Sequence, residues 1–486
     1  MGESRFGRRK FLGVTAAAGA VVAGSALLGE PLAAAASGVD YAGLKRALKG
    51  SLLRPGDAGY AAAARPFNAA LGVRRPAAIA RVAGADDVST CVRRVRGHGV
   101  PLAARGGGHS YAGFSTPDNG VVVDLSALKN ITVRTDGTAV VGAGVRLIDL
   151  YTALAAHGRA LPAGSCPTVG VAGSTLGGGI GVVARAYGLT CDHLKGATVV
   201  TADGALHTVD GNHDADLFWA LRGGGGGNGG IVTSFTFGTV PAPTVTIFSL
   251  RFPASRTAKV LRAWSAWMDA APDQLSSLCA VTAAATPTNR VTGTWTGSAG
   301  ALPAHLSSLI AAVGAAPTSR TTHTYSYLNA MKYFAGCLTK TVAACRVAGP
   351  EPFRAASRML ERTVTASIAD RIVAQMSRQK GMVLLFDSLR GQVARVGTGA
   401  TAFAHRGAHA SVQVYSGSAA SGAAVLSVQQ ALAPIIGTGA YVNYLNPGQR
   451  DWASAYYGAN LPRLRQVIKK YDPDRVFDFA QSVLRA

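Results

Sequence analysis

The sequence predicts an α+β fold with two or three domains. Runs of β-branched residues alternate with glycine clusters and with stretches of helical spacing, which indicates strands and helices along one chain. Hydrophobic residues make up 48% and charged residues 15% of the 486 residues, a composition that fills large cores and excludes intrinsic disorder. At roughly 100–200 residues per domain, this length corresponds to at least two domains.

Glycine, cysteine and net charge narrow the class further. The 60 glycines have no three-residue period, which excludes collagen, and six cysteines are too few to build a disulfide scaffold. The formal charge of +23 is compatible with nucleic-acid binding, with attraction to acidic surfaces or with solubility alone.

Residues 1–36 have the pattern of an export signal, here a twin-arginine signal peptide. Arg8 and Arg9 precede Lys10 and an apolar stretch at 14–28, and small alanines at 34–36 suit cleavage. A membrane anchor is the alternative, but this stretch is short for a span of about 20 residues. The segment holds four basic and two acidic residues, so its removal lowers the charge from +23 to +21. We therefore expect an extracellular or cell-envelope protein with no membrane span in the mature chain.

A short N-terminal segment at 37–74 is followed by a first domain at 75–240. Strands are predicted at 139–142 and 196–200, where β-branched runs end at turns, and a helix is predicted at 88–97 from its apolar spacing.

A second α+β domain is predicted at 241–439. Helix-like stretches at 259–268 and 361–369 alternate there with strand-like stretches at 382–386 and 411–415.

The remaining segment, 440–486, is too short to fold alone and must pack on the rest of the chain. It has helical spacing at 461–471, and Asp472-Pro473 ends that helix because a proline disfavours helix in the residue before it.

Three glycine-rich clusters carry the chemistry. The first runs from Arg105 to Gly113 and contains His109; consecutive glycines allow backbone amides to cradle a phosphate, and a turn without a ligand is the alternative. The spacing fits neither a Walker loop nor the first turn of a dinucleotide fold. His109 could be a hydrogen-bond donor, a base or a covalent attachment point.

The second and third clusters lie at 162–181 and 217–231. Cys166 in the second cluster is either a small buried hydrophobe or a loop nucleophile activated by nearby amides. In the third cluster, residues 217–222 precede a run of glycines interrupted by Asn228.

In order and spacing, the three clusters resemble the FAD-binding domain, of the PCMH type, of the vanillyl-alcohol oxidase superfamily. The end of the chain resembles the berberine-bridge-enzyme-like family. The matching motifs there are Tyr441-Val442-Asn443-Tyr444, Tyr456-Tyr457-Gly458-Ala459-Asn460, Tyr471-Asp472-Pro473, Val476-Phe477 and Gln481-Ser482. The resemblance covers about 75–483 and implies a two-part FAD-binding domain plus an α+β substrate domain with an antiparallel sheet and covering helices. This chain has Gly227-Asn228-Gly229-Gly230 where the family usually has Gly-Asn-Phe-Gly.

The resemblance implies FAD held by two covalent bonds, one from His109 to the 8α carbon and one from Cys166 to C6 of the flavin. Two bonds hold the ring rigidly and prevent loss of the cofactor outside the cell. The cofactor-binding residues that the resemblance implies are Arg105, Gly106, Gly107, Gly108, His109, Ser110, Gly113, Cys166, Val171, Gly173, Ser174, Gly177, Gly178, Gly179, Tyr187, Gly188, Asp192, Gly230, Ile231, Tyr441 and Asn443.

Such a cofactor takes hydride at N5, so oxidation of an alcohol needs a base for the hydroxyl proton. The resemblance assigns this role to Tyr444; a core tyrosine is the alternative. Gln413 and Tyr415, which follow the pair His405-Arg406, are further catalytic candidates, whereas His409 is expected to be an ordinary polar strand residue.

The other cysteines do not indicate cofactor attachment, and the sequence has no motif of a zinc site or of a serine hydrolase. Cys337 and Cys345 could form a disulfide or remain two buried thiols, while Cys91, Cys191 and Cys279 are expected to be structural. No grouping has the spacing of a zinc site, and no Gly-x-Ser-x-Gly elbow occurs at a strand–helix turn.

The expected function is therefore an FAD-linked oxidase or dehydrogenase that oxidises an alcohol, either a sugar or a secondary-metabolite hydroxyl. Dioxygen or another acceptor would reoxidise the flavin. An exported flavin-carrying binding protein with little turnover is the alternative. Basic residues are scattered and lack an aromatic-interleaved patch, so a nucleic-acid partner is not expected.

Overall fold

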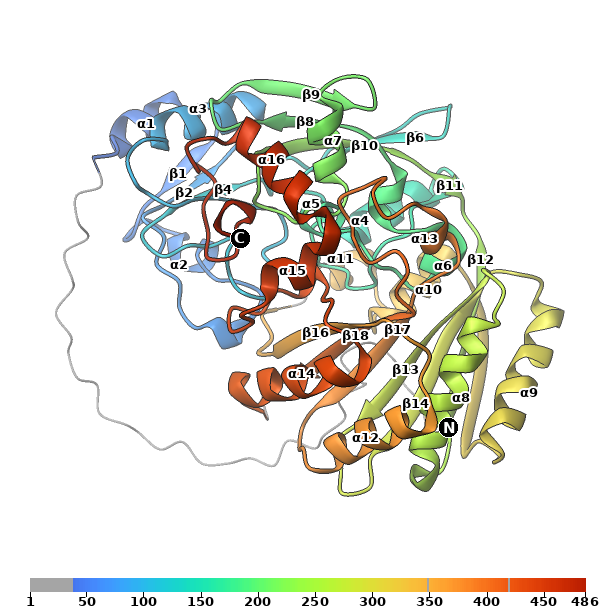
Figure 1. The fold of residues 1–486 in the computed structure, drawn as a ribbon. Helices are drawn as coiled ribbons and strands as arrows, with labels where there is room; N and C mark the ends of the chain where they lie inside the picture. Colours follow the sequence, from blue (N-terminus) through green and yellow to red (C-terminus); the bar gives the residue numbers. More distant parts are fainter. Residues whose placement is uncertain (1–37, 348, 418–419) are drawn as a thin grey trace.

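The computed structural model describes residues 38–486 except residues 348, 418 and 419. It confirms the predicted α+β class, since helices pack on three larger sheets and one two-stranded sheet (Figure 1). The expected export signal at 1–36 lies outside the described residues. In the part of the chain that is described, no helix is both long and apolar enough to cross a bilayer.

A four-stranded sheet opens the fold, with β2, β4 and β3 parallel and β1 antiparallel at the edge. In spatial order its strands are β1 (Ser51–Leu53), β2 (Ala78–Arg81), β4 (Val121–Asp124) and β3 (Leu102–Arg105). All four residues of β4 are buried, as expected of a central parallel strand covered on both faces. The predicted helix at 88–97 is confirmed as α3 (Ala85–Val95), which begins and ends earlier and buries its valines in the core of this half.

A five-stranded antiparallel sheet follows and is built around β10. Its strands in spatial order are β5 (Ile131–Val133), β6 (Thr138–Gly142), β10 (Ile231–Gly238), β8 (Leu194–Val200) and β9 (Leu206–Asp210). The strands predicted at 139–142 and 196–200 are confirmed as β6 and β8, and both pair with β10. Thus β10, the last of these strands in the sequence, lies between the earlier strands β6 and β8.

A seven-stranded antiparallel sheet forms the centre of the second half. Its strands in spatial order are β15 (Ser319–Ser326), β12 (Thr244–Arg251), β14 (Thr288–Trp295), β13 (Leu275–Thr282), β17 (Val383–Ser388), β18 (Ala410–Ser416) and β16 (Arg354–Leu360). The strands predicted at 382–386 and 411–415 are confirmed as β17 and β18. Helices pack with this sheet in one apolar core, namely α8 (Thr257–Asp269), α9 (Leu302–Val313), α12 (Ala366–Ser377) and α14 (Gly422–Ile436).

The helix predicted at 259–268 is confirmed as α8, but the one predicted at 361–369 is wrong in position. Strand β16 runs to Leu360, and α12 begins at Ala366 behind the cap residue Thr365, whose side chain accepts from the Ile368 amide. Long-range bonds hold the intervening residues extended: Glu361 accepts from the Gly439 amide, and the Val364 amide donates to Ser265. Tertiary contacts thus override local helix propensity here.

The C-terminal segment packs back on the first half, where α16 (Leu461–Tyr471) lies against α7 (Ala215–Leu221) (Figure 1). The helix predicted at 461–471 is confirmed with these bounds. It ends before Asp472, whose buried carboxylate accepts hydrogen bonds from the amides of Val476 and Phe477. An added Cβ at Gly229 would lie 2.8 Å from Ile468 Cδ1, so this side chain of α16 packs closely on the glycine.

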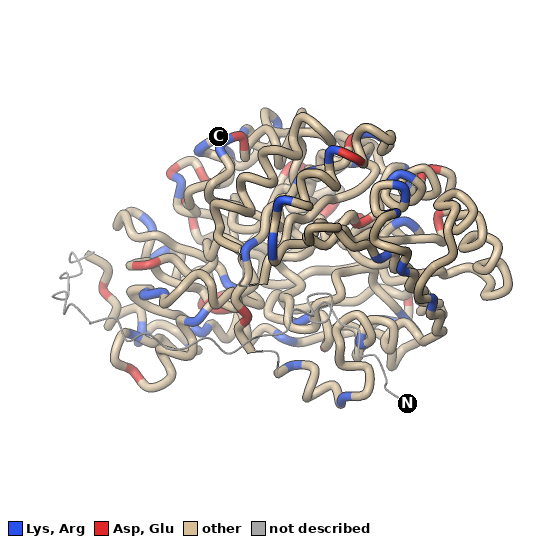
Figure 2. The backbone as a smooth tube through the Cα atoms, turned by 90° about the horizontal axis from the view of Figure 1, so that it is seen from below, with Lys and Arg blue, Asp and Glu red and all other residues tan. Residues whose placement is uncertain are grey.

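Shorter elements complete the two halves. The helices are α1 (Tyr41–Ala47), α2 (Tyr60–Ala63), α4 (Leu147–Ala155), α5 (Val171–Leu176), α6 (Ala184–Tyr187), α10 (Tyr327–Phe334), α11 (Val342–Cys345), α13 (Gln392–Arg395) and α15 (Trp452–Tyr457), and β7 (Arg159–Ala160) pairs with β11 (Val240–Pro241). Lys and Arg are spread over many segments and interspersed with Asp and Glu (Figure 2).

Candidate active site

A cavity of about 1600 Å³ lies between the glycine-rich loops of the first half, one face of the seven-stranded sheet and the C-terminal segment. Most of the site residues predicted from sequence line it. They are Gly106, Gly107, Gly108, His109, Ser110, Gly113, Cys166, Gly173, Ser174, Gly230, Ile231, Gln413, Tyr415, Tyr441, Asn443 and Tyr444. The fold therefore brings the predicted cofactor loops and the predicted catalytic residues to one site.

The first and second glycine clusters touch through their backbones. A Cβ added at Gly107 would lie 2.3 Å from the Gly170 amide nitrogen, and one added at Gly170 would lie 2.4 Å from the Gly107 amide nitrogen. Real Cβ atoms do not approach backbone so closely, so both positions require glycine. This contact fixes the loop that carries His109 against the loop that carries Cys166.

His109 is held in a defined orientation inside the cavity wall. Its ring stacks on Phe67 with centroids 3.8 Å apart, and Nε2 lies 3.0 Å from Thr168 Oγ1. Burial, together with the charge of Arg146, lowers the pKa of His109 to about 3. The imidazole is therefore neutral at physiological pH, which is the form that can act as a nucleophile.

Cys166 lines the same cavity and is partly exposed, unlike the other free cysteines in the described chain. Its Sγ lies 3.9 Å from Thr168 Oγ1, so one threonine hydroxyl contacts both predicted attachment residues. In contrast, Cys91, Cys191 and Cys279 are buried, and burial raises the pKa of each thiol, that of Cys91 to about 12. These three cysteines have the packing expected of structural residues.

Tyr441 and Asn443 bind the glycine run that follows α5. The Tyr441 hydroxyl accepts from the amide of Gly179, at 2.9 Å, and from that of Ile180. Asn443 donates to Tyr441 and to the Ser174 carbonyl. Burial raises the pKa of Tyr441, so this hydroxyl stays protonated. The two residues thus fasten the C-terminal segment to the predicted cofactor loop.

Tyr444 belongs to an aromatic cluster at the boundary between the loops and the sheet. Its ring stacks on Tyr111 with centroids 5.1 Å apart, and Gln413 Nε2 donates to the Tyr111 hydroxyl at 2.9 Å. Tyr415 stacks on Phe353, which in turn meets Tyr111 edge to face. The three predicted catalytic residues are therefore linked through Tyr111, a residue that the sequence analysis did not select although it lies two positions after His109.

The sheet face that lines the cavity carries polar side chains beside the apolar Leu278, Val383 and Leu385. Asp387 on β17 and Gln413 on β18 are diagonal neighbours, since Asp387 pairs with Ser411 and Leu385 pairs with Gln413. Ser249, Ser276, Thr292 and Thr294 line the same cavity from β12, β13 and β14. Sequence reasoning missed this surface because an alternating strand pattern does not tell which partner strands bring their polar faces together. Its hydroxyl and carboxyl groups can donate and accept hydrogen bonds within the cavity.

The remaining predicted cofactor residues do not line the cavity and lie behind the residues that do. They are Arg105, Val171, Gly177, Gly178, Gly179, Tyr187, Gly188 and Asp192. Arg105 pairs with Asp124 at 2.8 Å, Asp192 pairs with Arg406, and a Cβ at Gly177 would lie 2.1 Å from Asn443 Oδ1. Their contact with the cofactor stays a prediction, while their packing holds the loops that do line the cavity.

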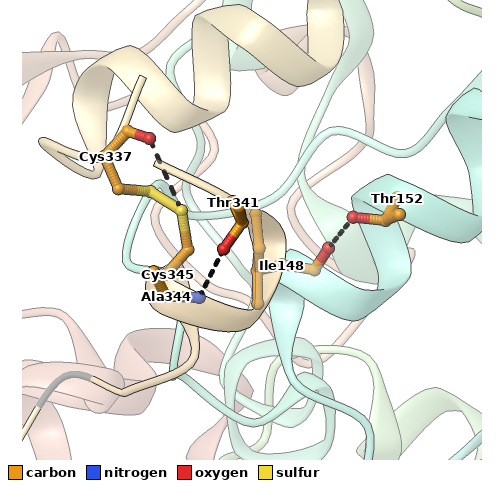
Figure 3. Close-up of a disulfide and its surroundings, with 6 residues drawn as sticks. All are labelled: Ile148, Thr152, Cys337, Thr341, Ala344 and Cys345. Atoms are coloured by element: carbon orange, nitrogen blue, oxygen red, sulfur yellow. Dashed lines mark hydrogen bonds between the residues drawn. A yellow bond between two sulfur atoms is a disulfide. The ribbon is translucent and has the colours of Figure 1, made fainter. Parts of the chain in front are cut away.

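A disulfide closes a loop at the cavity rim. Cys337 and Cys345 are bonded (Figure 3), which resolves the alternative that the sequence left open. Both residues line the cavity. The bonded loop packs on Ile148 of α4, the helix that follows Arg146 (Figure 3). Ion pairing between Arg346 and Asp149 adds a second link to α4. The rim of the cavity is thus tied to the half that carries His109 and Cys166.

His409 is not the ordinary strand residue expected from sequence. Its Nδ1 lies 2.7 Å from Asp269 Oδ1, and Nε2 contacts Arg390. It precedes β18 and is not part of the cavity lining.

The lining chemistry fits a dinucleotide-sized flavin cofactor. A Cβ added at Gly173 in α5 would meet no protein atom within 4 Å, so the backbone there is open to a close approach from the cavity. A neutral, partly buried imidazole and a cysteine thiol lie on adjoining loops, and the sheet face with its polar side chains lies across the cavity from them. Fold and site together define a flavin-dependent oxidoreductase.

Family models and full-length relatives agree with this class. Residues 76–210 match the model for an FAD binding domain, and 440–484 match the model for berberine and berberine-like proteins. The FAD-linked oxidoreductase YgaK of Bacillus subtilis (strain 168) is 33% identical over 451 residues, which are 90% of this chain and 98% of that one. The chain therefore belongs to the berberine-bridge-enzyme-like family of FAD-linked oxidoreductases.

Solved structures place the same fold in plant and fungal enzymes. Physcomitrella patens BBE-like 1 superposes with a TM-score of 0.84 at 28% identity, covering 90% of this chain and 98% of that chain. The glucooligosaccharide oxidase of Acremonium strictum, described with 6-S-cysteinyl, 8α-N1-histidyl FAD, superposes with a TM-score of 0.81 at 26% identity, covering 89% and 97%.

Proposed function

We propose that this protein binds FAD covalently through His109 and Cys166 and oxidises the alcohol group of a sugar, an oligosaccharide or a secondary metabolite. One observation carries the proposal: His109, Cys166 and Tyr444 line a single cavity whose far wall is a sheet face with polar side chains. We assign residues 75–240 to the FAD-binding domain, 241–439 to the substrate domain and 440–486 to the closing segment. The named glucooligosaccharide oxidase supports both the bicovalent attachment and the substrate class.

We assign the following roles to the residues around the cavity. FAD, when bound, accepts a hydride from the substrate C–H bond and passes the electrons to dioxygen or another acceptor. The phenolate form of Tyr444 would accept the hydroxyl proton of the alcohol and become the phenol, as a base positioned beside the reacting group. Gln413 and Tyr111, hydrogen bonded to each other beside Tyr444, orient that ring and bind substrate hydroxyls. Tyr415 and Phe353 offer a stacked aromatic surface for a sugar ring.

The test is anaerobic bleaching of the flavin by a panel of sugars and alcohols. The yellow protein should lose its absorbance with at least one donor, and admitting air should restore it. Rapid return marks an oxidase and slow return a dehydrogenase. A flavin that no alcohol in the panel reduces would favour the alternative, an exported flavin-carrying protein with little turnover.

The predicted export would favour a covalent cofactor. The predicted twin-arginine signal at 1–36 would carry the folded, flavin-loaded protein out of the cytoplasm. A covalent bond keeps the cofactor in place where free FAD is scarce. Mass spectrometry of protein recovered from the medium or cell envelope of a producing strain should find a mature N-terminus near Ser37; an uncleaved N-terminus in the cytoplasm would contradict export.

A further inference from the structure

The hydroxyl of Thr168 lies between the two residues assigned to flavin attachment. Its Oγ1 is 3.0 Å from His109 Nε2 and 3.9 Å from Cys166 Sγ, within the longer range of sulfur hydrogen bonds. Thr168 is only 3% exposed, so water does not compete for these contacts. Nothing in the assigned chemistry yet uses this residue.

One arrangement of the Thr168 side-chain hydrogen bonds serves both neighbours. A neutral imidazole carries one proton, and for its Nδ1 lone pair to attack carbon that proton must be on Nε2. The Nε2–H group then donates to Thr168 Oγ1. A threonine hydroxyl has a single proton, so that proton can point to Cys166 and stabilise its thiolate, the nucleophilic form of cysteine.

The surroundings keep this arrangement rigid. Phe67 stacks on the His109 ring and prevents it from turning, and the Gly107–Gly170 contact holds the two loops together. The amide of Ile148 in α4 donates to the Pro167 carbonyl, next to Thr168. Thr168 therefore sits on a fixed backbone between two fixed partners.

We infer that Thr168 is a shared positioning residue for both covalent bonds, setting the tautomer of His109 and donating to the thiolate of Cys166. The inference rests on the proposed bicovalent attachment. Each attachment replaces one C–H hydrogen of the flavin with a protein atom: the C–H and the N–H or S–H bond are lost, a C–N or C–S bond forms, and the two electrons and two protons reduce dioxygen to hydrogen peroxide. Dioxygen is thus the oxidant that the inference names.

The experiment measures attachment, not turnover. Thr168→Val and Thr168→Ser are made in three backgrounds: the unchanged chain, His109→Ala, where only the cysteinyl bond can form, and Cys166→Ala, where only the histidyl bond can form. The purified proteins are incubated aerobically with FAD, and intact mass after denaturation gives the flavin-bearing fraction over time. The absorption spectrum of acid-precipitated protein reports which bond has formed.

A matched control comes from Thr175, also in the second cluster. It is fully buried, does not line the cavity, and its hydroxyl makes no hydrogen bond within the described chain. Thr175→Val removes the same atoms as Thr168→Val without removing a contact to His109 or Cys166. It should flavinylate at the rate of the unchanged chain.

The expected result is that Thr168→Val slows both bonds roughly tenfold, the effect of losing about one hydrogen bond, and that Thr168→Ser restores them. Normal rates in Thr168→Val, or slowing of only one of the two bonds, would overturn the shared role. If Thr168→Val does not fold by circular dichroism, Thr168→Ala supplies the same comparison without added bulk. Absence of covalent flavin in the unchanged chain would instead overturn the proposed function, and this inference with it.

Discussion

Arg406 and Asp192 form a two-point ion pair between the loop that precedes β18 and the turn that follows α6. The guanidinium nitrogens lie 2.6 and 2.9 Å from the two carboxylate oxygens, and the Arg406 side chain is 2% exposed. Asp192 also accepts from the Leu189 amide, while Arg406 donates to Thr401. A buried charge pair therefore joins the predicted cofactor half to the sheet half.

Replacing Arg406 with methionine should destabilise the protein strongly. The exchange leaves the Asp192 carboxylate buried without its cation, which costs about 3–5 kcal/mol of unfolding free energy. Urea unfolding followed by circular dichroism measures the loss. Lys49→Ala, at the exposed pair with Asp86, is the control and should leave the midpoint unchanged. A shift of Arg406→Met no larger than this control would show that the pair contributes little.

Tyr444→Phe should slow substrate oxidation without loss of flavin. The exchange removes the hydroxyl that takes the substrate proton, a role worth about 10²–10⁴ in rate, and keeps the ring that stacks on Tyr111. Stopped-flow reduction of the flavin under anaerobic conditions measures the step. Tyr333→Phe, at another tyrosine that lines the same cavity, should stay within a few-fold of the unchanged rate. Equal losses in the two variants would remove the reason to assign the base to Tyr444.

Stability should fall in mild acid because of His405. Burial lowers the pKa of His405, whose Nε2 donates to the Tyr456 carbonyl, below the ordinary value of about 6.5. Below pH 6.5 the unfolded chain therefore binds a proton that the folded chain does not. The contribution of neutral His405 to the free energy of unfolding is thus fully present above pH 6.5 and is lost as the pH falls. The slope reaches at most about 1.4 kcal/mol per pH unit.

His405→Gln should flatten this pH dependence, since glutamine can keep the donor to Tyr456 and cannot titrate. Urea midpoints between pH 4.5 and 8 check the difference in slope. His213→Gln, at the exposed histidine beside Asp210, serves as the surface control. An unchanged slope in His405→Gln would assign the acid sensitivity to other groups.

The disulfide should stabilise the rim of the cavity. Cys337 and Cys345 are separated by eight positions, and the loop-entropy model gives about 2.5 kcal/mol for a loop of this size. Replacing both cysteines with alanine should lower the unfolding free energy by about that amount and raise KM more than it lowers kcat, because the loop borders the cavity. Dithiothreitol should affect the unchanged chain and not the double variant; equal sensitivity would point to another reducible group.

Sequence patterns predicted the parts of the fold that depend on local spacing. The helix at Leu461–Tyr471 was predicted to the residue because apolar periodicity and Asp472-Pro473 act within one segment. The helix at 361–369 was misplaced because Glu361 and Val364 are bound by residues about 80 and 100 positions away. The loops that line the cavity could be predicted because their glycines are a local sequence signal. Tyr111 and Asp387 could not, because their place in the site depends on how the folded chain brings the sheet and the loops together.

Two glycines on adjoining segments offer a last test of where the cofactor lies. Gly173 belongs to α5 and has room for a Cβ only toward the cavity, whereas a Cβ at Gly107 would collide with the backbone of Gly170. Gly173→Ala should therefore lower flavin occupancy while the flavin-free chain stays as stable, or gains up to about 1 kcal/mol from the better helix former. Gly107→Ala should lower both, because its partner is backbone and cannot move aside. Flavin absorbance per chain and thermal unfolding of the flavin-free fraction separate the two effects, and full flavin occupancy in Gly173→Ala would place the cofactor elsewhere in the cavity.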